Sequence, residues 1–201
     1  MIIVRILAGF TLFLLICYVT GNASEQPQKQ TTEDQAKRLY SEDAGTRSNA
    51  AKRLAAAGPS AIPSLVSVLC DKTRKNFDVA WPVAAKVLGE LKAEAAAPCL
   101  VEMLMDKYPS IGPVVGKSDE TLANVDPAFA ALVQIGEPAV PAIRRRLPFL
   151  LPEPAIMALR VLRAINTPSA KDAAEAYIKF IEDQSRLANQ ILRDFGQKPG
   201  E

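Results

Sequence analysis

The chain lacks the side chains on which most enzymatic chemistry depends. It has no histidine among its 201 residues, which excludes serine–histidine and cysteine–histidine nucleophile systems and histidine-ligated zinc. The sequence also holds no phosphate-binding glycine loop, no G-x-S-x-G turn, no C-x-x-C pair and no metal-spaced carboxylates. We therefore expect a protein that is not an enzyme and that uses neither a metal nor a cofactor.

Two groups of side chains could still form a bond or a binding site. They are the cysteines and a run of three arginines. Two cysteines, Cys70 and Cys99, fall in the body of the chain. A disulfide needs Cα atoms within about 7 Å, and the repeats described below place these two residues at opposite ends of neighbouring helices, so we expect no bond. Arg144, Arg145 and Arg146 would fan over about 300° of a helix. They should not form one anion-binding patch, and we expect the stem of Arg144 to be half buried.

The overall charge argues against a nucleic-acid partner. Lys and Arg number 24 and Asp and Glu number 22, which gives a net charge of +2. Binding to phosphate backbones requires a strongly basic face. We expect the partner to be a protein.

The first 23 residues resemble an export signal. Arg5 is their only charged side chain, and residues 6–19 are apolar except for Thr11. This run suits a signal-peptide core and is short for a membrane span, which needs about 20 residues. Small residues then lead to Ala23, after which we expect cleavage. Retention as an N-terminal membrane anchor is the alternative, and we expect membrane contact only through residues 1–23.

Composition divides the rest of the chain into three parts. Residues 24–31 are polar and are predicted to be a disordered tether. Thr32 and Gln35 fit a capping box that would start a helix near Glu33. Helices are then expected throughout residues 32–195, followed by a disordered tail at 196–201.

The body of the chain repeats a helical pattern. An alanine and a leucine spaced four apart lie on one helical face, and this Ala-x3-Leu pattern occurs four times. The pairs are Ala50 and Leu54, Ala84 and Leu88, Ala128 and Leu132, and Ala158 and Leu162. Each pair is followed by a short turn and a second apolar segment. Three of these segments carry a proline at an equivalent place, Pro63, Pro98 and Pro141, where a first helical turn tolerates it.

Helix pairs of this kind cannot bury their apolar faces alone, but stacked pairs form a continuous core. The sequence therefore predicts an all-α fold, an α-solenoid of about four helix pairs with N- and C-terminal capping helices. Segments 47–69 and 83–104 resemble HEAT repeats, in particular the short HEAT-like repeats of phycobilisome lyases. The resemblance covers about residues 36–182. It implies the fold but specifies no partner, because HEAT-like repeats serve many roles.

In such a stack the second helices would line a concave face. Matching the repeats by register places side chains in rows across this face. One row has Glu102 beside Arg145 and Arg145 beside Glu175, and a second contains Ser64, Cys99, Ala142 and Asp172. Such a face could recognise a protein segment, or its charges could simply pair with each other in solvent. The candidate partner-binding residues are Ser64, Ser67, Glu102, Arg145, Asp172, Glu175 and Lys179.

An insertion at residues 106–117 interrupts the repeats. It contains Tyr108, Ile111, Val114 and Val115 beside prolines and glycines. Exposed apolar loops often mark contact sites, although these side chains could also fold back over the helices. The next residues should start a helix, with Ser118 as its cap and two structural acids at its positive end.

These observations favour a non-catalytic scaffold or adaptor in the bacterial cell envelope. The chain would be exported, and either periplasmic or secreted after cleavage near Ala23, or anchored in the inner membrane facing outward. The resemblance to lyase repeats implies an alternative role in attaching a bilin chromophore, against which the export signal argues. A structural spacer anchored in the membrane is the third possibility.

Overall fold

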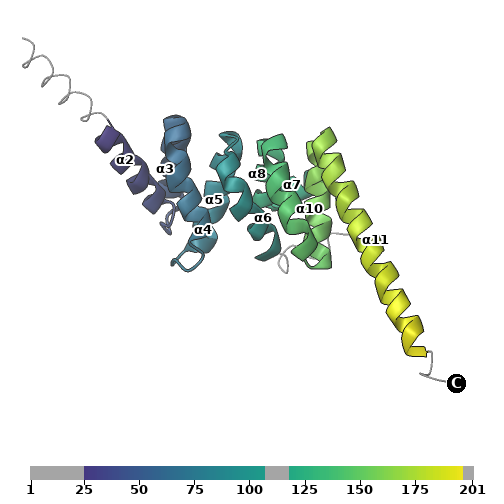
Figure 1. Cartoon of the computed structure of the whole chain (residues 1–201). Coiled ribbons are helices and arrows are strands. Elements are labelled where there is room, and N and C mark those ends of the chain that lie inside the picture. Colours follow the sequence, from purple (N-terminus) through teal and green to yellow (C-terminus); the bar gives the residue numbers. More distant parts are fainter. Residues whose placement is uncertain (1–24, 107–117, 197–201) are drawn as a thin grey trace, which may run out of the picture.

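The computed structural model describes residues 25–106 and 118–196, and in these ranges the fold is entirely helical with no strand. The helices form an elongated body, with α2 at one end and α11 at the other (Figure 1). They are α2 (Glu25–Arg38), α3 (Ala44–Ala57), α4 (Ile62–Cys70), α5 (Phe77–Glu90), α6 (Ala97–Asp106), α7 (Asp119–Val125), α8 (Pro127–Ile135), α9 (Val140–Arg146), α10 (Pro152–Ile165) and α11 (Pro168–Gly196). The all-α prediction is confirmed. The expected leader, residues 1–23, and the tail from residue 197 lie outside the described residues.

The first helix begins earlier than predicted. α2 starts at Glu25, so the expected tether is helical from that residue, and Thr32 lies inside the helix rather than capping it. Thr32 and Gln35 are buried. α2 packs on α3 and α4. Its buried residues begin at Thr32, and from this packed part the helix continues toward the N-terminus into the segment whose polar composition predicted disorder.

The Ala-x3-Leu pattern marks the core. All eight residues of the four pairs are fully or almost fully buried, at 0 or 1% exposure. They lie on α3, α5, α8 and α10, the first helix of each predicted pair. The small alanine lets a neighbouring helix approach while the leucine fills the space between helices. Pro63, Pro98 and Pro141 each occupy the second position of α4, α6 and α9, as predicted.

The helices pack in two rows. Each first helix contacts the next one, α3 with α5, α5 with α8 and α8 with α10. The second helices do the same, α4 with α6, α6 with α9 and α9 with α11. Each second helix also contacts the first helix of the following pair. Every described unit is therefore held by its neighbours in both rows.

Helices α5 and α8 of the first row approach each other closely at Gly89 of α5. A Cβ atom at this position would lie 2.9 Å from the backbone Cα of Ala131 on α8 and 2.5 Å from the side-chain oxygen of Gln134. The flexible Gln134 side chain can move, but a helix backbone cannot move without separating the two helices.

We expect Gly89→Ala to lower the free energy of unfolding by about 1–2 kcal/mol, because overpacking outweighs the gain of about 1 kcal/mol that alanine gives inside a helix. Urea unfolding followed by circular dichroism would measure this. Gly45→Ala in the first turn of α3 is the control, because the nearest atoms there belong to the exposed Asp43 side chain. A more stable Gly89→Ala variant would contradict the close contact.

Asp126 caps α8 from a buried position. Its carboxylate accepts hydrogen bonds from the backbone N–H groups of Ala128 at 2.9 Å and Phe129 at 3.1 Å. The residue is only 5% exposed. Burial raises the pKa of Asp126 above its ordinary value of 3.8, although the two N–H donors act in the opposite direction.

Because the folded state binds this proton more tightly than the unfolded state, the contribution of Asp126 to stability is greatest below pH 3.8 and is lost as the pH rises through the raised pKa. We expect Asp126→Asn to keep the cap and to remove this part of the pH dependence. Asp126→Ala should cost about 1–2 kcal/mol, since two buried N–H groups lose their acceptor. Urea unfolding between pH 3.5 and 7 would test both. Parallel pH profiles for wild type and Asp126→Asn would contradict the prediction.

The helix that follows the insertion begins as predicted. Ser118 accepts the backbone N–H of Thr121 at 3.1 Å and so caps α7. Asp119 accepts hydrogen bonds from Arg160 at 2.8 Å and Arg163 at 2.6 Å, which joins α7 to α10. Burial opposes ionisation of Asp119, but these two guanidinium groups outweigh it and lower its pKa.

One helical stretch among the described residues, 44–70, is long and apolar enough by composition to cross a membrane. In the fold it bends at Gly58, whose φ of 63° ends α3. Its leucines Leu54, Leu65 and Leu69 are fully buried against other helices. These residues contribute to the protein core.

Candidate partner-binding face

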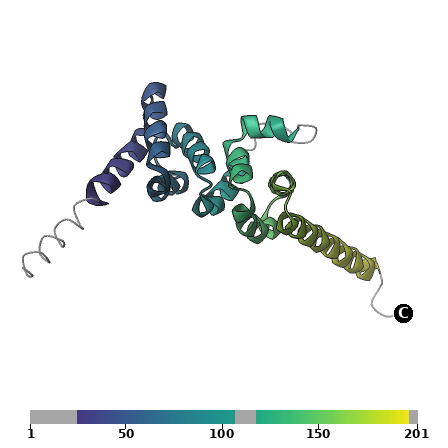
Figure 2. The same ribbon diagram turned by 90° about the horizontal axis from the view of Figure 1, so that it is seen from above.

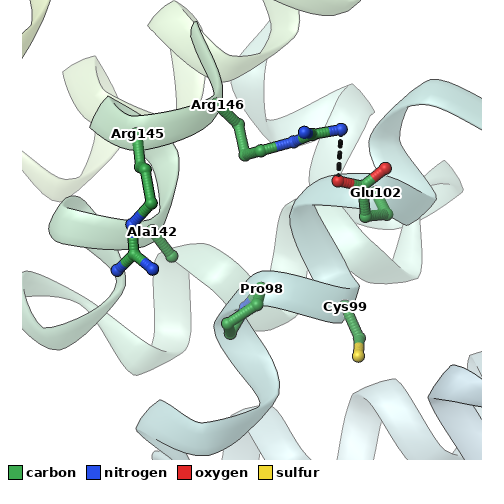
Figure 3. Close-up of a pocket in the computed structure, with 6 residues that line it drawn as sticks. All are labelled: Pro98, Cys99, Glu102, Ala142, Arg145 and Arg146. Atoms are coloured by element: carbon green, nitrogen blue, oxygen red, sulfur yellow. Dashed lines mark ion pairs between the residues drawn. The ribbon is translucent and has the colours of Figure 1, made fainter.

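A pocket opens between the second helices α6 and α9. It has a volume of about 190 Å³ and is lined by Pro98, Cys99, Glu102, Ala142, Arg145 and Arg146 (Figure 3). Pro98, Cys99 and Glu102 come from the first six residues of α6, and the others from α9. The surface inside the pocket is almost entirely apolar, and the charged groups of the lining residues lie at its edges. A pocket of this size suits one or two side chains of a binding partner.

An ion pair closes one side of the pocket. Arg146 reaches across from α9 to Glu102 on α6, with 2.6 Å between Nη2 and Oε1 (Figure 3). Both side chains are partly exposed, at 40% and 36%, so the pair is screened by solvent and contributes little to stability. The predicted partner of Glu102 was Arg145, and that prediction is wrong by one residue. α9 ends at Arg146 and turns into the 3-10 helix Leu147–Phe149, which leaves the last arginine on the side facing α6.

The arginine run is split between different environments, as the helical geometry predicted. Arg146 is partly buried, and its Nε is buried without a hydrogen-bond partner among the described residues. Arg145 is exposed and lies on the other side of the pocket, next to Ala142 (Figure 3). Arg144 is also exposed, so the expectation that its stem is half buried is wrong. The partly buried arginine is Arg146, since its stem lies along the pocket edge.

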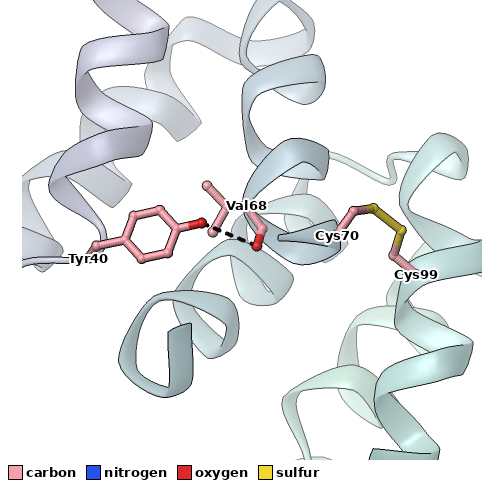
Figure 4. Close-up of a disulfide and its surroundings, with 4 residues drawn as sticks. All are labelled: Tyr40, Val68, Cys70 and Cys99. Atoms are coloured by element: carbon pink, nitrogen blue, oxygen red, sulfur yellow. Dashed lines mark hydrogen bonds between the residues drawn. A yellow bond between two sulfur atoms is a disulfide. The ribbon is translucent and has the colours of Figure 1, made fainter. Parts of the chain in front are cut away.

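A disulfide joins the first two units beside this pocket. Cys70, the last residue of α4, is bonded to Cys99 in the first turn of α6, with 6.0 Å between their Cα atoms (Figure 4). The expectation that these cysteines stay apart is wrong. It assumed that α4 and α6 lie level with one another. Instead the 3-10 helix Glu94–Ala96, just before α6, packs against α4. This packing brings the start of α6 to the end of α4.

Tyr40 contacts α4 near the C-terminal end of that helix, on the side opposite to Cys99. Its hydroxyl donates to the carbonyl of Val68 at 3.5 Å (Figure 4). The guanidinium of Arg74 lies 4.3 Å from the centre of the tyrosine ring, and Asn76 donates to the Tyr40 carbonyl at 2.9 Å. Burial raises the pKa of Tyr40, although Arg74 acts against this shift. The C-terminal end of α4 is therefore tied to Tyr40, in the segment that follows α2, on one side and to α6 on the other.

The structure brings together only part of the predicted face. Glu102 and Arg145 line the same pocket, as do Cys99 and Ala142 from a second predicted row. Ser64 and Ser67 lie on α4, where Ser64 is half buried and Ser67 exposed. The bond between Cys70 and Cys99 shows that the predicted alignment of Cys99 with Ser64 is offset between these units.

The fourth unit contributes exposed residues without a link to the pocket. Asp172, Glu175 and Lys179 are exposed on α11. Glu175 pairs with Lys171 along the same helix at 3.7 Å, and the predicted pairing with Arg145 is not found among the described residues. Tyr108, Ile111, Val114 and Val115 of the insertion lie outside the described residues.

Sequence reasoning missed Pro98 and Arg146 as parts of the site. The signal was available for Pro98, because it occupies the start of a second helix that had already been aligned. It was not available for Arg146, which depends on where α9 ends. The described residues hold no cluster of acidic, cysteine or histidine side chains suited to a metal ion.

Comparison with known proteins does not place the chain in a family: no family model matches it, and no curated protein is significantly similar to it.

Proposed function

We propose that this protein is a non-catalytic binding module, a short α-solenoid of the HEAT type that holds a segment of another protein on the face formed by its second helices. The four Ala-x3-Leu units, the equivalent prolines and the two rows of contacting helices support this assignment. Stacked repeats present extended surfaces of this kind, and protein segments are their usual ligands.

The observation that carries the proposal is the pocket between α6 and α9. Its apolar floor of Pro98, Cys99 and Ala142 can accept an aliphatic or aromatic side chain. Arg145 at its edge is free to pair with a carboxylate, since no ion pair engages it among the described residues. Glu102 already neutralises Arg146. The preferred ligand is therefore a peptide with an acidic residue close to an apolar one.

We also propose that the protein works outside the cytoplasm, in the cell envelope or beyond it. The apolar N-terminal segment supports export. The disulfide between Cys70 and Cys99 adds an independent argument, because such bonds persist mainly in oxidising compartments.

The peptide proposal can be tested with a displayed library of random peptides selected on the full chain. We expect the selected peptides to be enriched in acidic residues next to apolar ones. Arg145→Glu should weaken their binding about tenfold, because it replaces an attraction by a repulsion at the pocket edge. Fluorescence anisotropy with one labelled peptide at two salt concentrations would measure the effect.

Arg144→Glu is the matched control, since it makes the same charge change on the adjacent exposed residue that does not line the pocket. Ala142→Leu should block the apolar part of the pocket and reduce binding at any salt concentration. Equal losses of peptide affinity from Arg144→Glu and Arg145→Glu would show that binding depends on the overall charge of the protein and not on the pocket. Selection of no peptides, or of peptides insensitive to Ala142→Leu, would contradict the proposed site.

A further inference from the structure

The C-terminal helix is longer than its packing requires. α11 has 29 residues, and it contacts α9, α10 and the turn between them. Ala170 and Ala173 in its first turns are buried, and Tyr177 is half buried. From residue 178 to 193 every side chain is exposed. Figures 1 and 2 show this part extending away from the body, with no described element beside it in either view.

The extended part is amphipathic and not uniformly polar. Large apolar side chains recur on it at helical spacing, and several expose about half of their surface or more. They are Ile178, Phe180, Ile181, Leu187, Ile191 and Leu192. At 100° per residue these positions share one half of the helix circumference with Ala170, Ala173 and Tyr177. The stripe that packs α11 onto the body therefore continues, in the same phase, along the part that nothing covers.

A membrane surface is a poor match for this stripe. Helices that lie on membranes carry mainly lysine and arginine on their polar face. Between residues 178 and 193 the opposite face has three basic side chains, Lys179, Arg186 and Arg193, and two acidic ones, Glu182 and Asp183. A balanced face of this kind is typical of helices that pack on protein.

The order of residues in the stripe fits a second copy of the same helix. In an antiparallel pair centred on Arg186, Ile181 would face Ile191 of the other copy, and Gln184 would face the small Ala188. Ile178 of one copy would lie beside Leu192 of the other, and the two Leu187 side chains would lie beside each other. A parallel pair would instead bring two Gln184 amides together and leave a gap between two Ala188 residues, so large-with-small packing favours the antiparallel arrangement.

The helix dipoles support the same orientation, because they oppose one another in the antiparallel pair. The stretch 178–193 would span about 24 Å, which is long enough for a specific contact.

We propose that the exposed half of α11 is a self-association surface, through which two copies of this chain pair antiparallel around residue 186. The dimer would carry the two α6–α9 pockets on one assembly and so allow bivalent binding. The inference is independent of what the pockets bind.

Sedimentation velocity of the full chain tests the proposal. We expect the mass to rise from that of the monomer, at most 21.7 kDa, to twice that value between about 1 and 100 µM. Ile181→Glu combined with Leu187→Glu should abolish this change. The thermal melting of the variant should remain close to that of the wild type, because neither side chain is buried in the monomer. Lys179→Glu combined with Gln190→Glu, on the opposite face, is the matched control and should still dimerise.

Cysteine crosslinking tests the orientation. In a Cys17→Ser background, Ile181→Cys chains mixed with Ile191→Cys chains should give a dimer on mild oxidation that reducing agent separates, because these positions face each other only in the antiparallel pair. Ile181→Cys alone should remain monomeric under the same conditions, because only a parallel pair would bring two copies of this residue together.

Three outcomes would overturn the proposal. The first is a wild-type chain that remains monomeric at the highest concentration. The second is a dimer that survives Ile181→Glu with Leu187→Glu. The third is α11-dependent flotation with anionic lipid vesicles in place of dimerisation, which would assign the stripe to a membrane.

Discussion

Loss of the disulfide between Cys70 and Cys99 should lower the free energy of unfolding by about 3 kcal/mol. The bond closes a loop of 29 residues, and the entropy that such a crosslink removes from the unfolded chain corresponds to at most about 3.6 kcal/mol. The loop contains all of α5, which packs against α3, α4 and α8. The crosslink therefore stabilises the first two units together.

Urea unfolding of the wild type, of Cys70→Ser combined with Cys99→Ser, and of each protein with reducing agent would measure this effect. Reduction should lower the midpoint of the wild type to that of the double variant and should leave the double variant unchanged. Cys70 is exposed and Cys99 half buried, so the reductant can reach the bond without prior unfolding. A loss below about 1 kcal/mol would mean that the bond adds little to the folded arrangement.

A second large effect is expected at the centre of the first row of helices. Leu132→Ala should cost about 3–4 kcal/mol, within the range seen for fully buried leucines. Leu132 is 0% exposed and lies on α8. This helix contacts α5, α6, α7 and α10. With neighbours on so many sides, the helices around the truncated side chain cannot collapse into the space without losing contacts elsewhere.

Val125→Ala is the control for this prediction, because Val125 is an aliphatic residue of the adjacent helix α7 but is 48% exposed. Its substitution should change the free energy of unfolding by no more than about 0.5 kcal/mol. The measurement is urea unfolding under conditions that keep the disulfide intact. Comparable losses for both variants would contradict the assignment of Leu132 to a tightly packed core.

The helical units themselves follow from local pattern. The eight alanines and leucines of the Ala-x3-Leu pairs were placed on one face by their spacing, and all are buried. Pro63, Pro98 and Pro141 mark helix starts because the first helical turn is where a missing N–H does not matter. Both signals act over a single turn, so the sequence alone is enough to locate them. The start of α2 was not predictable in this way, because its first residues, 25–31, are all polar or proline and show no apolar spacing.

The candidate site was only partly predictable, and the reason is geometric. Repeat alignment brought Glu102, Cys99, Ala142 and Arg145 to one face, and these four residues do line one pocket. It could not determine how far each helix is shifted along its neighbour. That shift decides whether Cys99 meets Cys70 or Ser64. Whether Glu102 pairs with Arg145 or Arg146 depends instead on where α9 ends.

For this protein the sequence by itself determined the helical class, the residues of the core and the absence of histidine-based chemistry. The tertiary structure decided the disulfide, the pocket between α6 and α9, and the extension of α11 beyond the body. The physical reason is that a 3.6-residue period depends on the chain within one turn, whereas the offset between helices depends on side chains and 3-10 turns that are distant in sequence. Contacts between units, where binding takes place, are set by that offset.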